Sequence, residues 1–586
     1  MVDTLTLVLV GIVAYTLVAM VAKSQGLLPD AVRVSGPITT IHTQRGKAFL
    51  TWLAGPKRFW RAWGNFGVGI ALVVMVGSFL LVLFAGVQAL TNPTPTPLNR
   101  PRNVLAIPGV NEFLPLSAAV EILLGLLIGL VVHEGGHGLL CRVEDIDIDS
   151  MGVALLAFIP IGAFVQPDEE SRKVADRGAQ TRMFAAGVTN NFAVAIVAYA
   201  LLFGPVIGSI GVVAGVPIGG TIPGAPADRA GIERGDVITA VDGVSVENAA
   251  ELEAVLANTS ERSVSVTLKR GETVTVQRSL VVVGATADAP LEVNTTVVAV
   301  NGTEVHTQAA FERAIADRPV ATLTTATGET VTAPMGAYAV PVEGEAFVAA
   351  GAPAGETVFI TRIDDTRIDD QQALARFLDT TSEGQQVRVV AYVDGERRTY
   401  EVTLGAHPSE DTGFLGVGAL QPGTSGMAFD DFGIDEYPAS FFLSALGGGE
   451  GSLGITSFAQ RAFLALTLPF AGVSLGVGHN FPGFVGVFQN FYVAEGALSF
   501  LGSGGLFFLA STLFWTAWIN LIIGQFNCIP AFPLDGGHIL RASTEAVVSR
   551  LPVTRQVALT RAVTTTVSLS MLAALLLMVF GPRLLT

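Results

Sequence analysis

Two histidines and a glutamate in one short motif carry the strongest chemical signal in the chain. His133 and His137 are four positions apart, and Glu134 directly follows the first histidine. On an α-helix, residues four apart project from one face with Cβ atoms about 5–6 Å apart, so both imidazoles can bind one metal ion. Glu134 is then placed to take a proton from an attacking water rather than to bind the metal. The alternative is a polar network between helices that holds no metal.

A catalytic metal site generally has three protein ligands and an open position for water, so a third ligand is required. Asp535 is the strongest candidate. It lies in a stretch, 527–538, where two prolines and two glycines interrupt an apolar run. Broken backbone at membrane depth is tolerated only where it lines protein or a wet cavity. We therefore expect one catalytic Zn²⁺ ion held by His133, His137 and Asp535. His538 could be mistaken for a ligand, but we expect it to hydrogen-bond a ligand instead.

Membrane helices must hold these residues, because the composition is too apolar for an ordinary soluble enzyme. Half of the 586 residues are hydrophobic and only 14% are charged. A run of about 20 apolar residues can span a bilayer as a helix. Six runs qualify, at 5–22, 66–90, 116–140, 183–207, 506–529 and 557–580. The first run lacks the basic start and the clear cleavage site of a signal peptide, so we expect a retained helix.

Basic residues between the helices predict the orientation, since Lys and Arg favour cytoplasmic loops. They cluster between the first two runs and between the last two, at Lys47, Lys57, Arg58, Arg61, Arg541, Arg550, Arg555 and Arg561. Both loops should be cytoplasmic, which puts the His133 motif at the cytoplasmic end of its helix and the polar region after the fourth run outside the cell. A further apolar segment, 452–478, should be re-entrant, interfacial or a helical pair, because a single crossing would turn the final loop outward.

The polar region from 217 to 437 repeats a pattern of strand, turn and short helix. In the first repeat, the stretch 224–236 resembles the PDZ domains of bacterial and archaeal proteases. The third repeat has only an abbreviated version of that stretch, at 351–356, and the middle one lacks it. We therefore expect a PDZ domain at 217–283 and a second PDZ-like domain with a degenerate half-repeat at 284–405.

The sequence leaves two roles open for this PDZ region. A PDZ domain usually binds an extended peptide or a C-terminus by adding it to a sheet edge. The other role is that of a rigid spacer, which keeps bulky proteins away from the membrane site. Both roles can hold in one protein.

The charge balance narrows the classes of partner. The net charge is −16 and the acidic residues crowd into the polar region, so the chain offers no basic face for nucleic acid. Strong acidity with scarce Lys fits a halophilic archaeal source, and an acidic extracytoplasmic face of an ordinary microbe explains it equally well. The two cysteines, Cys141 and Cys528, lie in apolar runs and make no disulfide framework.

Together, the motifs resemble the site-2 protease family of intramembrane metalloproteases, which pairs HExxH on one membrane helix with NxxPxxxxDG on a later one. Both patterns match, at His133, Glu134, His137, Asn527, Pro530, Asp535 and Gly536. The resemblance implies that Asn527 contacts the substrate strand and that 146–165 is a membrane-embedded β-hairpin. Asn191, in a stretch similar to a GPxxN-like element of the family, either handles substrate or is a helix-packing amide. Gly135 and Gly136 cost about 1 kcal/mol of helix propensity each and predict a close approach by a helix or substrate.

The expected fold class is a multi-span α-helical membrane protein with an inserted α+β PDZ-type soluble region. N-terminal helices and a cytoplasmic loop should occupy 1–115. The two halves of the catalytic core should occupy 116–210 and 501–586, the second ending in a C-terminal helix. A linker with the re-entrant or interfacial apolar segment should occupy 406–500.

The activity that the resemblance implies is that of an intramembrane zinc metalloendopeptidase in the cell membrane. Its substrate would be a membrane-spanning regulatory protein, cleaved in the bilayer after a first cut in its ectodomain. A non-proteolytic membrane scaffold and a metal transporter are the alternatives. The intact His133, Glu134, His137 and Asp535 count against the scaffold, and a transporter would need several polar spans.

Overall fold

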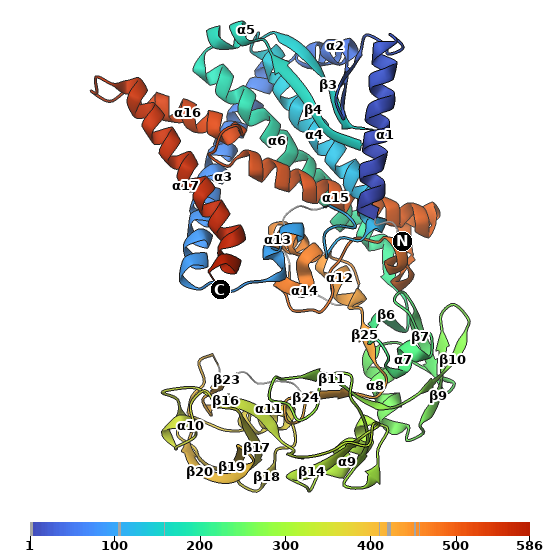
Figure 1. The fold of residues 1–586 in the computed structure, drawn as a ribbon. Coiled ribbons are helices and arrows are strands. Elements are labelled where there is room, and N and C mark those ends of the chain that lie inside the picture. The colour runs from blue at the N-terminus through green and yellow to red at the C-terminus, as the bar shows by residue number, and fades with distance from the viewer. Residues whose placement is uncertain are drawn as a thin grey trace. The chain divides into compact units, whose positions relative to one another are not determined.

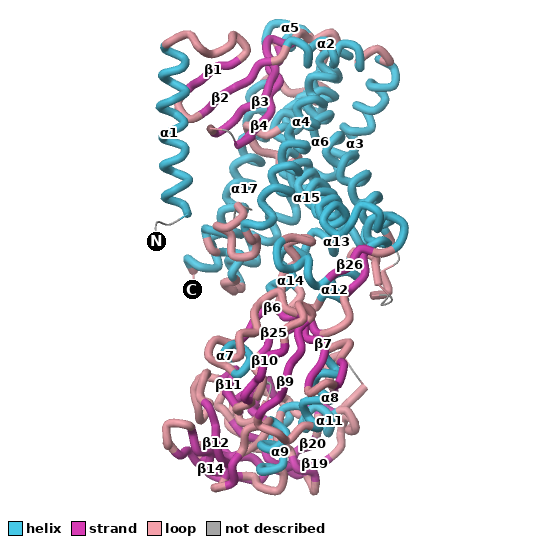
Figure 2. The backbone as a smooth tube through the Cα atoms, turned by 90° about the vertical axis from the view of Figure 1, so that its right-hand side faces the viewer, coloured by secondary structure: helices cyan, strands magenta, loops and turns pink. Residues whose placement is uncertain are grey.

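The computed structural model describes residues 4–103, 107–157, 159–409, 411–418, 423–449, 453–455 and 457–585. These residues form two compact units. One unit, Met1–Val212 with Ser440–Thr586, is built mainly from long helices, and we call it the helical unit (Figure 1). The other, Val213–Ala439, is built mainly from strands, and we call it the PDZ-type unit (Figure 2).

Among the described residues, five helical segments are long and apolar enough to cross a membrane. They contain α3 (Lys57–Thr91), α4 (Ala119–Val143), α6 (Arg177–Leu201), α15 (Gly502–Asn527) and α17 (Gln556–Leu584). Helix α15 packs against α4 and α6, and α17 packs against α3. The first expected span is also a helix, α1 (Thr4–Ser24), of 21 residues. These helices confirm the predicted multi-span α-helical class.

A four-stranded antiparallel sheet accompanies the helices. Its order is β1-β2-β3-β4, and the strands are β1 (Val32–Ser35), β2 (Ile38–His42), β3 (Ile148–Leu156) and β4 (Ile159–Pro167). The predicted hairpin at 146–165 corresponds to β3 and β4, although Phe158 lies outside the described residues. The hairpin of β1 and β2, which the sequence analysis did not predict, pairs with β3 from Ile38 opposite Leu156. Strand β4 therefore forms one edge of the sheet.

The further apolar segment at 452–478, which was not expected to cross the membrane as a single helix, contains short helices among its described residues. They are α13 (Phe458–Thr467), a 3₁₀ turn at Leu468–Phe470 and α14 (Ala471–Ser474). Pro469 lies at the break, where it cannot donate a helical hydrogen bond. None of these described pieces approaches the roughly 20 residues that a spanning helix needs. The expectation that this segment does not cross as a single helix agrees with this arrangement.

The PDZ-type unit contains three sheets with the same strand order, each completed by a strand from the end of the unit. The first has the order β10-β9-β7-β6-β25, with strands Thr273–Gln277, Ser263–Leu268, Val237–Val241, Val216–Thr221 and Ile434–Glu436. The second has the order β15-β14-β12-β11-β24, with strands Thr330–Pro334, Val320–Thr325, Thr296–Val300, Leu280–Ala285 and Met427–Asp430. The third has the order β20-β19-β17-β16-β23, with strands Glu396–Thr403, Gln386–Val393, Val358–Ile363, Ala337–Pro341 and Val417–Gly418.

The local chemistry repeats with the sheets. Each sheet has one helix of eight to ten residues, namely α8 (Ala249–Asn258), α9 (Gln308–Ile315) and α11 (Gln371–Leu378). The residue before each helix caps it, because its side-chain oxygen accepts a backbone N–H at 3.0–3.1 or 2.6 Å; these residues are Asn248, Thr307 and Asp370. Asp242, Asn301 and Asp364 occupy the same turn in the three sheets with φ of 48°, 51° and 50°.

This arrangement differs from the predicted two domains with a degenerate half-repeat. Within the PDZ-type unit, the described residues form three complete sheets, each with its own helix and apolar core. The middle unit lacks the 224–236 motif, but its alternating apolar residues still build the sheet. Part of the expected linker at 406–500 also consists of sheet strands, since β23, β24 and β25 join the third, second and first units in turn. These strands have only two to four residues, too few for a periodic sequence signal.

Candidate metal centre

Helix α4 holds the two motif histidines on one buried face. His133 and His137 are 6% and 9% exposed, and their Nε2 atoms are 3.2 Å apart. Close packing by α6 makes this possible, because a Cβ on Gly136 would lie 2.8 Å from the Ala186 oxygen. A Cβ on Gly187 of α6 would lie 2.7 Å from His137 Nε2. Gly136 thus permits the close helix approach expected from the sequence, whereas Gly135 faces open space.

Asp535 reaches the same point from the far end of the sequence. It is the first residue of α16 (Asp535–Val548), and its Oδ2 lies 3.2 Å from His133 Nε2 and 3.3 Å from His137 Nε2. The following glycines let the chain fold back on itself. A Cβ on Gly536 would lie 2.4 Å from the Ile529 oxygen, and one on Gly537 would lie 2.8 Å from the Ala531 carbonyl carbon. The broken stretch at 527–538 therefore brings the carboxylate to the histidines.

The hydrogen bonds at the Nδ1 atoms of His133 and His137 determine which nitrogen of each ring carries a lone pair. His137 Nδ1 lies 2.8 Å from the Met183 carbonyl oxygen, and His133 Nδ1 lies 3.2 Å from Asn191 Oδ1. Both oxygens are acceptors, so each Nδ1 donates a proton and each Nε2 presents a lone pair. Among the described residues, no hydrogen-bond donor reaches Asp535 Oδ2. Three electron-rich atoms thus converge in a buried space, an arrangement that suits a cation between them.

The distances among these three atoms fit a tetrahedral metal ion. Zinc bonds of about 2.0–2.1 Å at tetrahedral angles separate neighbouring ligand atoms by about 3.3–3.4 Å. The three separations in the structure are 3.2, 3.2 and 3.3 Å. His133, His137 and Asp535 can therefore hold one ion and leave a fourth position open.

Glu134 lies beside this triangle but points to a different partner. Its Oε2 accepts a hydrogen bond of 2.9 Å from the backbone N–H of Val165, in the edge strand β4. A carboxylate oxygen of Glu134 and the ligand nitrogens of His133 and His137 all lie within 4.8 Å of one another. Asp535 rather than Glu134 makes the shorter ligand-like contacts. Glu134 is near enough to exchange a proton with a water at the open position.

The two asparagines singled out in the sequence have different surroundings. Asn191 is fully buried, with Oδ1 against His133 Nδ1 and Nδ2 donating to the Gly129 oxygen at 3.4 Å. These contacts fit the orientation of a candidate ligand and correspond to the packing amide, one of the two roles that the sequence left open. Asn527 is half-buried at the end of α15, and its Nδ2 donates to the Ile523 oxygen of the same helix at 3.1 Å.

His538 does not make the expected hydrogen bond to a ligand within the described part of the chain. Its ring instead stacks on Phe184 with centroids 4.3 Å apart, and meets the Phe532 ring edge-on at 5.1 Å. Burial lowers the pKa of His538, which favours the neutral ring. Phe184, which lies on α6, also meets the ring of His137 edge-on, with the ring centroids 6.5 Å apart. Phe184 therefore lies between the ring of His538 and that of His137.

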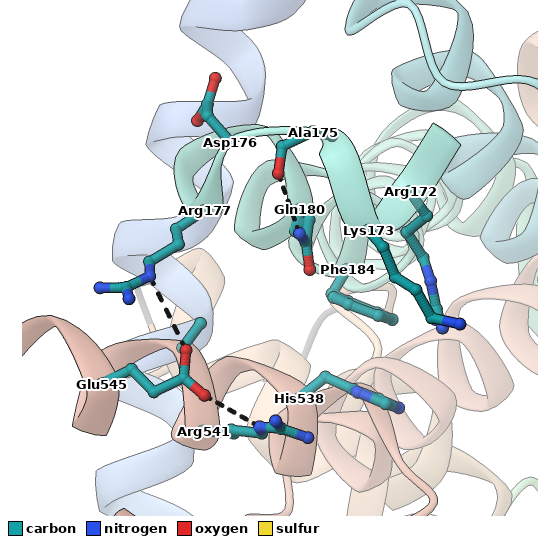
Figure 3. Close-up of a pocket in the computed structure, with 11 residues that line it drawn as sticks. Arg172, Lys173, Ala175, Asp176, Arg177, Gln180, Phe184, His538, Arg541 and Glu545 are labelled. Atoms are coloured by element: carbon teal, nitrogen blue, oxygen red, sulfur yellow. Dashed lines mark hydrogen bonds and ion pairs between the residues drawn. The ribbon is translucent and has the colours of Figure 1, made fainter. Parts of the chain in front are cut away.

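A cavity of about 540 Å³ opens beside His538 and was not predicted (Figure 3). Arg172 and Lys173 come from α5 (Glu169–Val174), and Glu545 of α16 pairs with Arg177 at 3.8 Å and with Arg541 at 3.0 Å. A basic cluster at 172–177 was the available signal. The Met183 carbonyl and the Val165 N–H were also missed, because backbone groups leave no trace in residue type.

The sequence is similar to known proteins over parts of its length. The sequence matches peptidase family M50 over residues 121–574. An uncharacterized protein of Methanocaldococcus jannaschii is 27% identical over 146 residues, which are 24% of this chain and only 38% of that relative. The PDZ domain of an SdrC-like protein from Listeria monocytogenes matches 15% of this chain and 90% of its own, with 20% identity and a TM-score of 0.14. Because the family match covers most of the sequence, from within α4 to within α17, the chain belongs to peptidase family M50, a family of membrane-embedded metallopeptidases.

Proposed function

We propose that this protein is a zinc-dependent endopeptidase that cleaves transmembrane segments inside the bilayer. The triangle of His133 Nε2, His137 Nε2 and Asp535 Oδ2 carries the proposal, because its sides of 3.2–3.3 Å match the spacing of tetrahedral zinc ligands. When bound there, Zn²⁺ would supply Lewis-acid chemistry and lower the pKa of water. The intact ligand set argues against a purely structural scaffold.

Glu134 would act as general base and then as general acid. Its carboxylate lies next to the ligand triangle and can accept a proton from the attacking water. The same carboxylate can then donate that proton to the leaving amide nitrogen. The hydrogen bond from Val165 N–H holds the side chain in place before substrate arrives.

The substrate must be extended when it is cut, because a closed helix hides each carbonyl behind its own hydrogen bond. Strand β4 is the edge of its sheet and carries Val165, which contacts Glu134. An unwound substrate segment that pairs with β4 would therefore run past Glu134. Asn527, at the end of α15, would contact the same segment.

The proposed substrates are membrane-tethered regulatory proteins that have already lost part of their ectodomain, as in regulated intramembrane proteolysis. The clusters of Lys and Arg between the first two and the last two apolar runs support a catalytic site toward the cytoplasm. The same rule supports an extracytoplasmic PDZ-type unit, which would meet the shortened ectodomain.

The test uses the full-length protein purified in detergent, with zinc measured per chain and cleavage measured on a model transmembrane substrate. Wild type should contain one zinc per chain and cleave. Glu134→Gln should keep its zinc and lose at least about 10²-fold in cleavage rate, since it removes only the proton acceptor. Equal cleavage by wild type and Glu134→Gln would overturn the mechanism, and wild type without zinc would overturn the cofactor.

A further inference from the structure

A cavity of about 710 Å³ lies beside the edge strand of the first PDZ-type sheet. One wall is helix α8, which contributes Leu252, Glu253 and Leu256. Strand β25 (Ile434–Glu436), the last strand of its sheet, also lines it, as do residues of α9 and α11 from the other two sheets. An edge strand facing a helix across a groove is the arrangement that accepts an extended peptide as an added strand.

The loop before β25 has the conformation that binds a terminal carboxylate in other proteins. Its backbone N–H groups, however, already donate to a side chain of this protein. Gly433 has a φ of +82°, and the loop directs the N–H groups of Phe432 and Gly433 to one point. Successive amides of this kind form an anion-binding concavity. Both amides donate to Asp430 Oδ1, at 2.6 and 2.8 Å. The chain's own carboxylate thus takes the place that a peptide C-terminus would need.

The one basic side chain that lines this groove is also neutralised. Arg278 is buried, and its Nε and Nη2 donate to the carboxylate of Asp431 at 2.8–3.1 Å. Its Nη1 donates to the Thr259 oxygen at 2.6 Å. Asp431 Oδ2 in turn accepts the backbone N–H of Gln308 at 2.6 Å. Neither these amides nor this guanidinium remains for a second carboxylate.

The rest of the lining is acidic and apolar except for Gln308 and Gln372. Against Arg278 stand six carboxylates, those of Glu253, Glu312, Asp430, Asp431, Asp435 and Glu436. Burial, together with neighbouring carboxylates, raises the pKa of Asp430 and of Glu436. This crowding of negative charge favours a cationic occupant. Leu252, Leu256 and Ile434 offer apolar contacts between the charges.

We propose that this groove binds an extended polypeptide segment rich in Lys or Arg through its internal residues, and that it does not select a free C-terminus. A cut ectodomain would then be read by its basic internal sequence and not by the new end. The binding preference rests on the groove alone, whereas the identification of the bound segment as a cut ectodomain rests on the proposed function.

The test uses the full-length protein in a neutral detergent and measures fluorescence anisotropy of labelled octapeptides. The probes are an alternating Val/Arg peptide with an amidated C-terminus, the same peptide with a free carboxylate, and an alternating Val/Glu peptide. The amidated Val/Arg peptide should bind at least as tightly as the free acid, and the Val/Glu peptide should not bind. A free acid that binds tenfold tighter than the amide, or equal binding of Val/Glu, would overturn the proposal.

Isosteric variants locate the binding. The double variant Glu253→Gln, Glu436→Gln should weaken the amidated Val/Arg peptide by about tenfold, because it removes two charges that line the groove. Glu329→Gln, on an exposed turn outside the cavity, serves as the matched control and should bind like wild type. An equal loss in both would show binding to general negative charge and would sink the proposed site.

A third variant tests the occupied loop. Asp430→Ala frees the N–H groups of Phe432 and Gly433, so the free-acid peptide should now bind about tenfold tighter than the amide. Asp430→Asn keeps an acceptor oxygen and should show no such preference. Glu134→Gln should bind all three peptides like wild type, so failure of the protease mechanism and failure of this site give different results. No gain for the free acid in a folded Asp430→Ala protein would contradict the claim that Asp430 blocks the loop.

Discussion

Two of the buried clusters of charged groups are balanced in opposite ways. In the helical unit, His133, His137 and Asp535 turn three electron-rich atoms toward one point without a positive group between them. In the PDZ-type unit, Asp431 is matched by the guanidinium of Arg278 at 2.8 Å. The first cluster has room for a cation among its three atoms, whereas the second already contains its own cation, the guanidinium of Arg278. The charge balance thus distinguishes the helical-unit cluster, which is suited to bind a cation, from the PDZ-type cluster, in which an ion pair within the protein already neutralises the charge.

The largest expected effect is the loss of metal from Asp535→Ala. This change removes one of three ligands and leaves two neutral imidazoles, so zinc affinity should fall by more than the about 10–100-fold that outer partners contribute. Zinc per purified chain is the measurement. Asp147→Ala, which removes a carboxylate 78% exposed on the surface, is the control and should keep its zinc. Full zinc in Asp535→Ala would assign the third ligand elsewhere.

Arg278→Met tests the PDZ-type cluster. It leaves Asp431 buried without its cation, which should cost about 3–5 kcal/mol in the stability of the first PDZ-type sheet. Hydrogen exchange of peptides from 216–277 would report the loss. Arg388→Met breaks an exposed pair with Glu401 and should change stability by less than about 1 kcal/mol.

The double variant Arg278→Met, Asp431→Leu should recover most of that stability, because no unpaired charge remains. If Arg278→Met is as stable as Arg388→Met, the ion pair does not hold the sheet.

Asn191→Ala separates two roles for one residue. Loss of the contact to His133 Nδ1 should reduce zinc affinity by about 10–100-fold. Asn190→Ala, on the same helix, loses only the bond from Trp63 Nε1 and should retain zinc. An unchanged zinc affinity with a raised KM would instead support direct substrate contact by Asn191.

A lower pH should slightly weaken peptide binding in the groove of the PDZ-type unit while the fold stays intact. The raised pKa values of Asp430 and Glu436 mean that these groups gain protons before ordinary carboxylates do as the pH falls. Going from about pH 7.5 to about pH 5.5 should therefore weaken the amidated Val/Arg peptide by about threefold. The other charged groups that line the groove are Glu253, Asp431, Asp435, Glu312 and Arg278. A tighter complex at the lower pH would contradict this charge assignment.

The convergence of the three candidate ligands was predictable because residue type, spacing and a broken apolar run all indicated the same residues. His133 and His137 share a helical face, and Asp535 stands where prolines and glycines interrupt a span. The role of Asn191 was not predictable, since the sequence does not tell which face of α6 meets α4. The strands β23, β24 and β25 were missed because each pairs with a distant partner that determines its register.

The proposed mechanism depends most on the metal ion and its three ligands. X-ray absorption at the zinc edge of the purified protein measures them directly. It should show two nitrogen ligands and one carboxylate oxygen, all at about 2.0–2.2 Å, and Asp535→Ala should lose the signal of the bound ion. Sulfur ligands at about 2.3 Å, which only Cys141, Cys528 or a methionine could supply, or a protein that binds no zinc, would contradict the account.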